Sequence, residues 1–454
     1  MAGHSTKLQI SGYRFLLRRM EHALVRGDTR MADDPVRAQS LSFTAGAVVA
    51  MIVAALCVVL AFLRPPGALG DAPIVIVRES GALYVRVGDV VHPVLNLASA
   101  RLIVGTAADP EAVSASAVNN AKRGPLLGIP GAPADVTVPL GQAESGWAVC
   151  DEKSKTTVVA GTLPDGATTS AVLVTPRSES AALTYLLYDG WRAQVDLRDR
   201  AVVRALRLDG HVPRPVSRVL LDATPEAPPI RAPRIVGAGS PSPLRGSPVG
   251  TVVRVIRADA EEYYVVLAAG VQRIGRVVAD LIRFADSQND RDIATVSPDS
   301  IAAMPILSML AVAAFPEQSG VADDAVVCTR WNATENGVNT SVVSTNSHSM
   351  GAAVTLAQAD GDGPSVDAFA VPPGRCAFVR AVEIGGGDAD SGALYFINDS
   401  GVVFGIRDGD SAKHLGLSGA PVPAPWPVLS WLPRGPELSK NAASVARDSV
   451  AGSP

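Results

Sequence analysis

The chain has 454 residues, of which 47% are hydrophobic and 5% aromatic, and its formal net charge is −4. Residues 1–41 hold seven Lys and Arg against four Asp and Glu, a net charge of +3, so the rest of the chain carries −7. An acidic main region argues against a nucleic-acid partner, because binding to phosphates requires a basic surface.

The N-terminal arm has the pattern of an amphipathic helix over residues 12–27. Apolar side chains recur there at helical spacing, namely Tyr13, Leu16, Leu17 and Met20. An isolated helix of this length is only marginally stable in water, so the apolar stripe favours docking on a partner protein or on lipid. A solvated helix held only by the next segment is the alternative.

An uncharged run from Gln39 to Leu63 is long enough to cross a bilayer. As a helix its 25 residues would span about 37 Å, more than the hydrocarbon core of about 30 Å. The run is too long and begins too late for a cleaved signal peptide, so it predicts a permanent single-pass anchor. Seven basic residues precede it and only Arg64 and Arg78 follow closely. The positive-inside rule therefore places the N-terminus in the cytoplasm and residues 64–454 outside.

Beyond the anchor, short apolar runs alternate with turn residues, as in a β-rich protein. One pattern occurs four times: a tyrosine-containing strand leads to a glycine turn and a second apolar strand, which is typical of a hairpin. The four tyrosines are Tyr84, Tyr185, Tyr264 and Tyr395. Their uneven spacing excludes a regular solenoid and favours four related modules, projecting in pairs from a central core.

The sequence thus predicts a bitopic membrane protein with an N-terminal cytoplasmic helix, one transmembrane helix and a β-rich α+β periplasmic region of four repeat modules around a central core. The predicted segments are a cytoplasmic amphipathic arm (1–41), a transmembrane helix (42–63), a linker (64–73), the first module (74–140), the first core segment (141–182), the second module (183–235), the third module (245–294), the second core segment (295–390), the fourth module (391–438) and a disordered tail (439–454).

Three of the four cysteines lie on the outer, oxidising side of the anchor, and the fourth, Cys57, lies within it. We predict a disulfide between Cys150 and Cys328, because each lies in a strand-like run of one core segment with a tryptophan three residues away. Cys376 would then remain unpaired. A bond between Cys328 and Cys376 is the alternative.

No catalytic motif is recognisable. The sequence has no phosphate-binding P-loop, no His-Glu-x-x-His and no Gly-x-Ser-x-Gly, and its six histidines are scattered. Acidic turns that contain Asp388, Asp390 and Asp399 are a conceivable calcium site, but they lack two ligands of the EF-hand pattern. We therefore expect no catalytic residue, no cofactor and no metal.

Several long segments resemble the EccB family, the membrane components of the mycobacterial type VII (ESX) secretion machinery. They include Gly12-Tyr-Arg-Phe-Leu-Leu-Arg-Arg-Met-Glu-His, Gly81-Ala-Leu-Tyr-Val-Arg-Val-Gly-Asp and Lys122-Arg-Gly-Pro-Leu-Leu-Gly-Ile-Pro-Gly. The resemblance implies a subunit of a hexameric inner-membrane complex, with the EccC, EccD and EccE components and further copies of itself as partners. It also implies four periplasmic repeat domains around a core, and Cys376 stands where relatives are expected to have glycine.

The main hypothesis is therefore a structural subunit of such a complex. Two other classes of function remain open. Family members are often catalogued as ATPases, which makes an ATP hydrolase the first alternative, although no nucleotide site is recognisable in the sequence. The repeats alone would also fit a module that binds the cell envelope.

Overall fold

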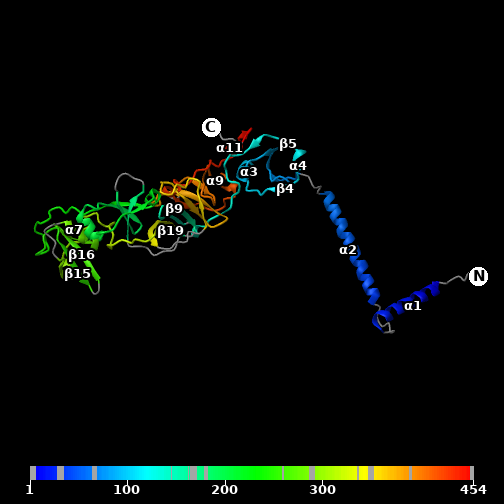
Figure 1. The fold of residues 1–454 in the computed structure, drawn as a ribbon, viewed down its shortest axis with the longest axis horizontal. Helices are drawn as coiled ribbons and strands as arrows, with labels where there is room; N and C mark the ends of the chain where they lie inside the picture. Colours follow the sequence, from blue (N-terminus) through cyan, green and yellow to red (C-terminus); the bar gives the residue numbers. More distant parts are fainter. Residues whose placement is uncertain are drawn as a thin grey trace, which may run out of the picture. The chain divides into compact units, whose positions relative to one another are not determined.

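The computed structural model describes residues 7–27, 35–63, 69–144, 146–161, 163, 171–177, 183–257, 260–285, 292–334, 337–345, 352–387 and 391–449. Its contacts divide the chain into two compact units, one formed by residues 1–70 with 113–118 and the other by residues 71–112 with 119–454. The first unit contains the two long N-terminal helices, and the second contains the β-rich region (Figure 1).

The two long helices are α1 (Lys7–Arg26) and α2 (Pro35–Leu63). Proline is favoured in the first turn of a helix, where its missing N–H would have no partner, so Pro35 can begin α2. The predicted transmembrane segment 42–63 is thus the C-terminal portion of a longer helix. Its apolar stretch Leu41–Leu60 is long enough to span a membrane, and none of it is buried.

The first sheet begins directly after the predicted linker. Its strand order is β4-β1-β2-β3-β5, with β1, β2 and β3 antiparallel in succession and β5 parallel to β3. The elements of this region are β1 (Ile74–Val77), β2 (Leu83–Val87), β3 (Val90–Pro93), α3 (Leu97–Val104), β4 (Glu111–Val113), α4 (Ala115–Asn119) and β5 (Lys122–Arg123).

The second sheet has the order β13-β10-β11-β12-β14. A two-residue loop joins β11 to β12, and both of its residues have positive φ, 46° at Asp189 and 81° at Gly190. Asp-Gly is the preferred sequence for such a type I′ hairpin, which explains the turn. The elements are β10 (Val172–Pro176), β11 (Tyr185–Tyr188), β12 (Trp191–Val195), α5 (Arg200–Leu206), β13 (Arg214–Val216), α6 (Arg218–Asp222) and β14 (Glu226–Ile230).

The third and fourth sheets have the orders β17-β16-β15-β18 and β25-β24-β23-β26. The third region comprises β15 (Val252–Arg257), β16 (Ala260–Leu267), β17 (Gly270–Ile274), α7 (Arg276–Ala285), β18 (Ala294–Thr295) and α8 (Pro298–Ala302). The fourth comprises β23 (Arg375–Val382), β24 (Leu394–Ile397), β25 (Val403–Ile406), α9 (Gly409–Leu415), β26 (Val422–Pro425) and α10 (Trp426–Leu429).

The four sheets share one order of connections. In each, three antiparallel strands are followed by a helix, an outer strand and a second helix. In the second, third and fourth sheets the outer strand (β13, β18 or β26) is parallel to the first strand of the meander. After the second helix, the chain returns and pairs in parallel with the third strand of the meander. In the first two sheets this returning segment is a strand, β5 or β14. In the third and fourth sheets it pairs there through an isolated bridge, at Ile306 or Arg434.

A fifth, central sheet combines strands that are far apart in the sequence, in the order β20-β19-β8-β9-β22-β21. It therefore draws on both segments that were predicted to form the core. Its strands are β8 (Gly146–Glu152), β9 (Lys155–Gly161), β19 (Val326–Thr334), β20 (Gly337–Thr345), β21 (Ala353–Thr355) and β22 (Ala368–Ala370). The remaining short elements are β6 (Leu126–Leu127), β7 (Val138–Pro139), η1 (Gln142–Glu144), α11 (Lys440–Ala443) and β27 (Ala446–Arg447).

Two tryptophans anchor the core of the central sheet. Trp147 and Trp331 lie opposite each other in β8 and β19, and each is only 1% exposed. The same apolar cluster includes Val174 of the second sheet and Val379 of the fourth, so the three sheets share one core. Truncating a buried tryptophan typically costs about 3–5 kcal/mol, which makes this cluster a major source of stability.

The four smaller sheets also share apolar cores in two pairs. Ile74 and Leu102 of the first region pack in one cluster with Phe396 of the fourth. Leu206 of the second region packs in another cluster with Leu281 of the third. In each pair the helix after the meander meets its counterpart: α3 contacts α9, and α5 contacts α7.

Two strands belong to the second and fourth sheets, although the sequence predicted that they lie in the core segments. Residues 172–176, predicted to lie in the core segment 141–182, form β10 of the second sheet, and residues 375–382, predicted to lie in 295–390, form β23 of the fourth. The boundaries at 182 and 390 are therefore wrong for these strands. A valine-rich strand fits any buried sheet, and its local pattern does not reveal which strand it will pair with.

The prediction of a disordered tail over residues 439–454 is wrong for its first residues. The hydroxyl of Ser439 caps α11 by accepting a hydrogen bond from the N–H of Ala442. Further on, β27 pairs with β6, and Nε of Arg447 donates to the carbonyl of Gly128 at 2.9 Å. These partners are more than 300 residues away along the chain, so local periodicity could not indicate them.

Replacing Gly190 by alanine should destabilise the fold. The new Cβ would lie 2.0 Å from the carbonyl oxygen of Thr340 in β20, whereas at Gly210, with a similar φ of 79°, it would meet no atom within 4 Å. Both changes cost about 1 kcal/mol for the positive φ, and Gly190→Ala should cost about 1–3 kcal/mol more because of the overlap. Thermal unfolding of the chain in detergent measures this. Equal Tm values for the two variants would contradict the close approach of the hairpin to the central sheet.

Candidate assembly and binding surfaces

The four side chains predicted to dock on a partner lie on one face of α1. Their exposed fractions range from 41% for Leu17 to 67% for Tyr13, with Leu16 and Met20 between them. Phe15 is also exposed, but helical spacing places it on the opposite side of α1 from the stripe. An apolar helix surface of this kind is suited to burial against another protein or a membrane.

The central sheet holds the predicted disulfide between Cys150 and Cys328. The two residues lie directly opposite each other in β8 and β19, with their Cα atoms 4.1 Å apart and both side chains fully buried. The bond spans 178 residues of sequence, which include the second and third sheets. In the chain-entropy model, a closed loop of this length constrains the unfolded chain by about 5 kcal/mol.

Cys376 is a free thiol, as predicted, and it is fully buried in β23. Its Sγ donates to the carbonyl oxygen of Thr137 at 3.1 Å, and burial raises the pKa of the thiol to about 11. Because the thiolate is the reactive form, Cys376 is inert at neutral pH while the chain is folded.

A buried carboxylate, Asp151, connects the central sheet to the second sheet. It accepts hydrogen bonds from the backbone N–H and the hydroxyl of Ser217 and from the hydroxyl of Thr156, and it forms an ion pair with Arg177 at 3.2 Å. Burial raises the pKa of Asp151, and Arg177 with the three donors opposes this rise. Removing one partner of such a group typically costs about 3–5 kcal/mol. Asp151 could not be recognised from the sequence, because Ser217 lies 66 residues away along the chain.

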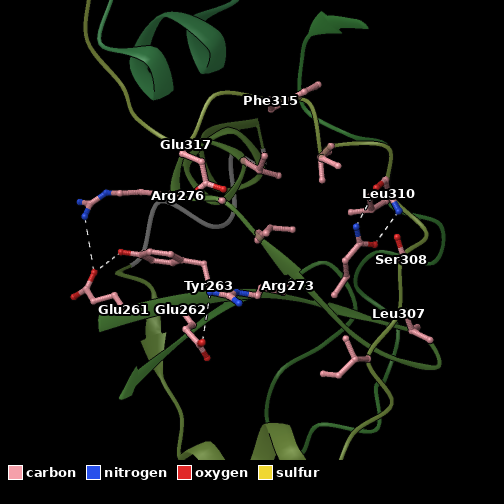
Figure 2. Close-up of a pocket in the computed structure, with 17 residues that line it drawn as sticks. Glu261, Glu262, Tyr263, Arg273, Arg276, Leu307, Ser308, Leu310, Phe315 and Glu317 are labelled. Atoms are coloured by element: carbon pink, nitrogen blue, oxygen red, sulfur yellow. Dashed lines mark hydrogen bonds and ion pairs between the residues drawn. The ribbon is translucent and has the colours of Figure 1, made fainter. Parts of the chain in front are cut away.

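The third sheet borders a cavity of about 600 Å³ beneath the segment 306–317 (Figure 2). Its apolar lining includes Ile274, Val278, Leu310 and Phe315. Gln272 in β17 holds the covering segment in place. Its Oε1 accepts from the N–H groups of Met309 and Leu310, each at 2.8 Å, and its Nε2 donates to the carbonyl of Leu310 at 3.0 Å.

Charged side chains surround this cavity. Glu261 accepts a hydrogen bond from the hydroxyl of Tyr263 and lies 3.9 Å from the guanidinium of Arg276 (Figure 2). It also accepts from the guanidinium of Arg254 at 3.0 Å. The hydrogen bond from Tyr263, followed by the two arginines, lowers the pKa of Glu261. Burial and donation to Glu261 raise the pKa of Tyr263.

Glu262 forms a second network of the same type. It accepts from the hydroxyl of Tyr264 at 3.0 Å and pairs with Arg257 and Arg273, and these contacts lower its pKa, the hydrogen bond from Tyr264 most of all. Both glutamates are thus fixed as ionised acceptors, which is unfavourable for a general acid near neutral pH. The pattern Glu-Glu-Tyr-Tyr was visible in the sequence, but its partners come from other strands and from α7.

The candidate calcium turn lies partly outside the described residues, which exclude Asp388 and Asp390. Asp399 is exposed, and Oδ1 of its carboxylate accepts from the hydroxyl of Ser400 at 3.4 Å. Within the described regions of the chain, no group of three or more His, Cys, Asp or Glu side chains is placed to hold a metal ion.

Peptide mapping without reductant should recover one linked peptide pair, which contains Cys150 and Cys328. In the native chain Cys376 should resist alkylation at pH 8, since its pKa of about 11 keeps it protonated and its side chain is buried. After unfolding in denaturant it should react fully. A Cys328–Cys376 peptide, or rapid alkylation of native Cys376, would contradict the arrangement.

Comparison with known proteins gives a consistent family. The family model described as "Type VII secretion system ESX-1, transport TM domain B" (T7SS_ESX1_EccB) matches residues 2–452. The chain is 37% identical to the ESX-3 secretion system ATPase EccB3 of Mycolicibacterium smegmatis, over 100% of this chain and 92% of that protein. It is 34% identical to the ESX-5 secretion system ATPase EccB5 of Mycobacterium marinum, over 99% of this chain and 94% of that protein.

Solved structures agree with these matches. A chain of an intact ESX-5 inner membrane complex is similar with a TM-score of 0.72 and 33% identity, covering 100% of this chain and 98% of that one. A chain of the EccB3 dimer from the ESX-3 core complex is similar with a TM-score of 0.71 and 35% identity, covering 82% and 100%. The likeness therefore includes the N-terminal helices as well as the β-rich region, and the chain belongs to the EccB family of type VII secretion components.

Proposed function

We propose that this chain is a structural subunit of the inner-membrane complex of a type VII secretion system, with its β-rich region contributing to the periplasmic assembly. The observation that carries the proposal is the similarity over the full chain to a subunit of an intact ESX-5 inner membrane complex. A second, shorter match is to a chain of the periplasmic assembly of the same complex, with a TM-score of 0.69. The partners are EccC, EccD and EccE components and further copies of this chain.

The outer region is built from four related modules set around the central sheet. The shared order of strands and helices in the first four sheets supports this organisation. The sharing of apolar clusters between the first and fourth sheets, and between the second and third, supports an arrangement of modules in pairs. A pair of modules buries more apolar surface than a single small sheet can, which stabilises both.

The chain crosses the membrane once, with its N-terminus in the cytoplasm. A cysteine introduced at exposed Ser240 should react with a membrane-impermeant maleimide in spheroplasts, because the outer region faces the medium there. A cysteine at exposed Ser11 is the control and should react only after lysis. The natural cysteines interfere little, since the outer ones are bonded or buried. The reverse labelling pattern would overturn this topology.

The apolar stripe of α1 docks on the other subunits. Changing Leu16 and Leu17 to Glu should abolish co-purification with the complex, because two charges would have to be buried, while glutamate preserves helix propensity. The control combines Ser11→Glu with Arg18→Gln, which makes the same change of net charge away from the stripe. Quantitative mass spectrometry of purified membranes measures the association. Equal recovery of both variants would show that the stripe is not a docking surface.

The chain assembles without hydrolysing ATP, although its relatives EccB3 and EccB5 are named as ATPases. Glu261 and Glu262 are each paired with arginines, so both carboxylates already have partners within the chain. The purified chain should release phosphate from ATP no faster than buffer does. A turnover that is lost in Glu261→Gln, or in Glu317→Gln at another residue that lines the cavity, would support the hydrolase instead.

A further inference from the structure

In three of the four smaller sheets, the returning segment contacts the third strand of the meander twice. The second contact comes three residues further along the meander strand and four residues further along the returning segment. In each of these sheets the second contact brings in a leucine or isoleucine. The pairs are Leu127 with Val94, Ile230 with Val195 and Leu438 with Ile406.

The third sheet lacks this second contact. Its returning segment bridges β17 at Val271 with Ile306. The spacing in the other sheets predicts a further pair between Ile274 and Leu310, but no such bridge forms between these two described residues. The N–H of Leu310 bonds instead to the side chain of Gln272.

A proline distinguishes the other returning segments from the third. Two residues after the first contact they have Pro125, Pro228 and Pro436, whereas the third segment has Ser308. Proline fixes φ and keeps the residue before it out of the helical region, so it favours an extended path beside the meander strand. Without this constraint, the third segment can turn away from β17.

The missing contact leaves two backbone groups at the edge of β17 unpaired. In the fourth sheet, the carbonyl of Gly405 accepts from the N–H of Leu438 at 2.7 Å, and the N–H of Arg407 donates to the carbonyl of Leu438 at 3.2 Å. The corresponding groups of the third sheet are the carbonyl of Arg273 and the N–H of Gly275. Alternation along the strand turns both away from β16, and neither has a hydrogen-bond partner among the residues that the structure describes.

The cavity of about 600 Å³ lies at this same edge (Figure 2). Arg273 and Gly275 line it from the strand side, and Leu307 and Leu310 line it from the returning segment. Its volume falls within the range of ligand sites. We refer to the two unpaired backbone groups and the cavity together as the strand slot.

The chain's own segment is held away from the strand slot. Gln272 is only 6% exposed, and its amide makes three hydrogen bonds to the backbone of Met309 and Leu310. Moving Leu310 into the slot would break these bonds and leave a buried amide unpaired, which is unfavourable. A segment from another chain can enter the slot without this loss.

We propose that the strand slot binds an extended peptide segment of another protein. The peptide pairs in parallel with β17 at Arg273 and Gly275, and a leucine or isoleucine side chain enters the cavity. The occupant is inferred from the segments that fill the same position in the other three sheets of this chain. In such strand addition, backbone hydrogen bonds provide affinity and the side-chain pocket provides specificity. The slot is a partner site separate from the apolar stripe of α1.

Binding should be measured by fluorescence polarisation with the full-length chain in lipid nanodiscs. The probe is Pro-Glu-Leu-Ser-Lys, labelled on its lysine, because this sequence of residues 436–440 supplies the second contact of the fourth sheet. The peptide should bind, and replacing its leucine by alanine should weaken binding by at least about tenfold.

Modified peptides test the backbone pairing without altering the protein. N-methylation of the leucine amide should weaken binding by about tenfold, because the carbonyl of Arg273 would lose its donor. N-methylation of the glutamate amide is the matched control and should have little effect. The corresponding N–H of Glu437 has no partner among the described residues of the fourth sheet.

A pair of variants tests the other backbone group. Gly275→Pro removes the N–H and should weaken binding by about tenfold. Gly275→Ala keeps the N–H, and its Cβ would lie 3.8 Å from the carboxylate of Glu317, an ordinary contact distance. It should bind like the parent, and equal Tm values for the two variants show that the loss is local. Amide hydrogen exchange at Gly275 should be rapid in the free chain and slow when the peptide is bound.

The proposal is wrong if the peptide does not bind, or if the two N-methylated peptides bind equally well. It is also wrong if Gly275→Pro binds as tightly as Gly275→Ala. Slow exchange at Gly275 in the free chain would overturn it as well, because the chain's own segment would then fill the strand slot.

Discussion

The pairing of β8 with β19 is the contact on which the rest of the β-rich region depends. It places Trp147 opposite Trp331 and Cys150 opposite Cys328, so an apolar contact and a covalent bond hold the same two strands together. Both strands are central in their sheet, with β9 and β20 as their outer neighbours. The second and third sheets are inserted in the chain between them, and without this pairing the insertion would separate the two halves of the core.

Side-chain hydrogen bonds hold chain segments that lie outside the regular strands and helices. Asp151 holds the start of α6 through Ser217, and Gln272 holds the segment at Met309 and Leu310 through three hydrogen bonds. In both cases a side chain replaces the missing backbone partner of a segment that is neither strand nor helix. A buried group with all its hydrogen bonds satisfied specifies one arrangement, because any alternative leaves it unpaired.

Local features of the fold were predictable from the sequence, and its long-range pairings mostly were not. The uncharged run predicted α2, and the tyrosine–glycine pattern led to the hairpins, including the Asp189-Gly190 turn. The disulfide was also predictable, because its two strand-like runs each carry a tryptophan at the same distance from the cysteine. By contrast, β10 and β23 have the same valine-rich character as the central strands, so their sheet could not be assigned.

The place of β8 in the chain also sets an order of events during synthesis. The β8–β9 hairpin emerges early and, like other isolated hairpins, is marginally stable until β19 follows. The inserted second and third sheets can pair and bury their shared cluster in the meantime. Cys328 then precedes Cys376 by 48 residues, which at 5–20 residues per second is a delay of roughly 2–10 s. The order in which the thiols appear therefore favours the bond between Cys150 and Cys328, because Cys376 is the last of the three to become available.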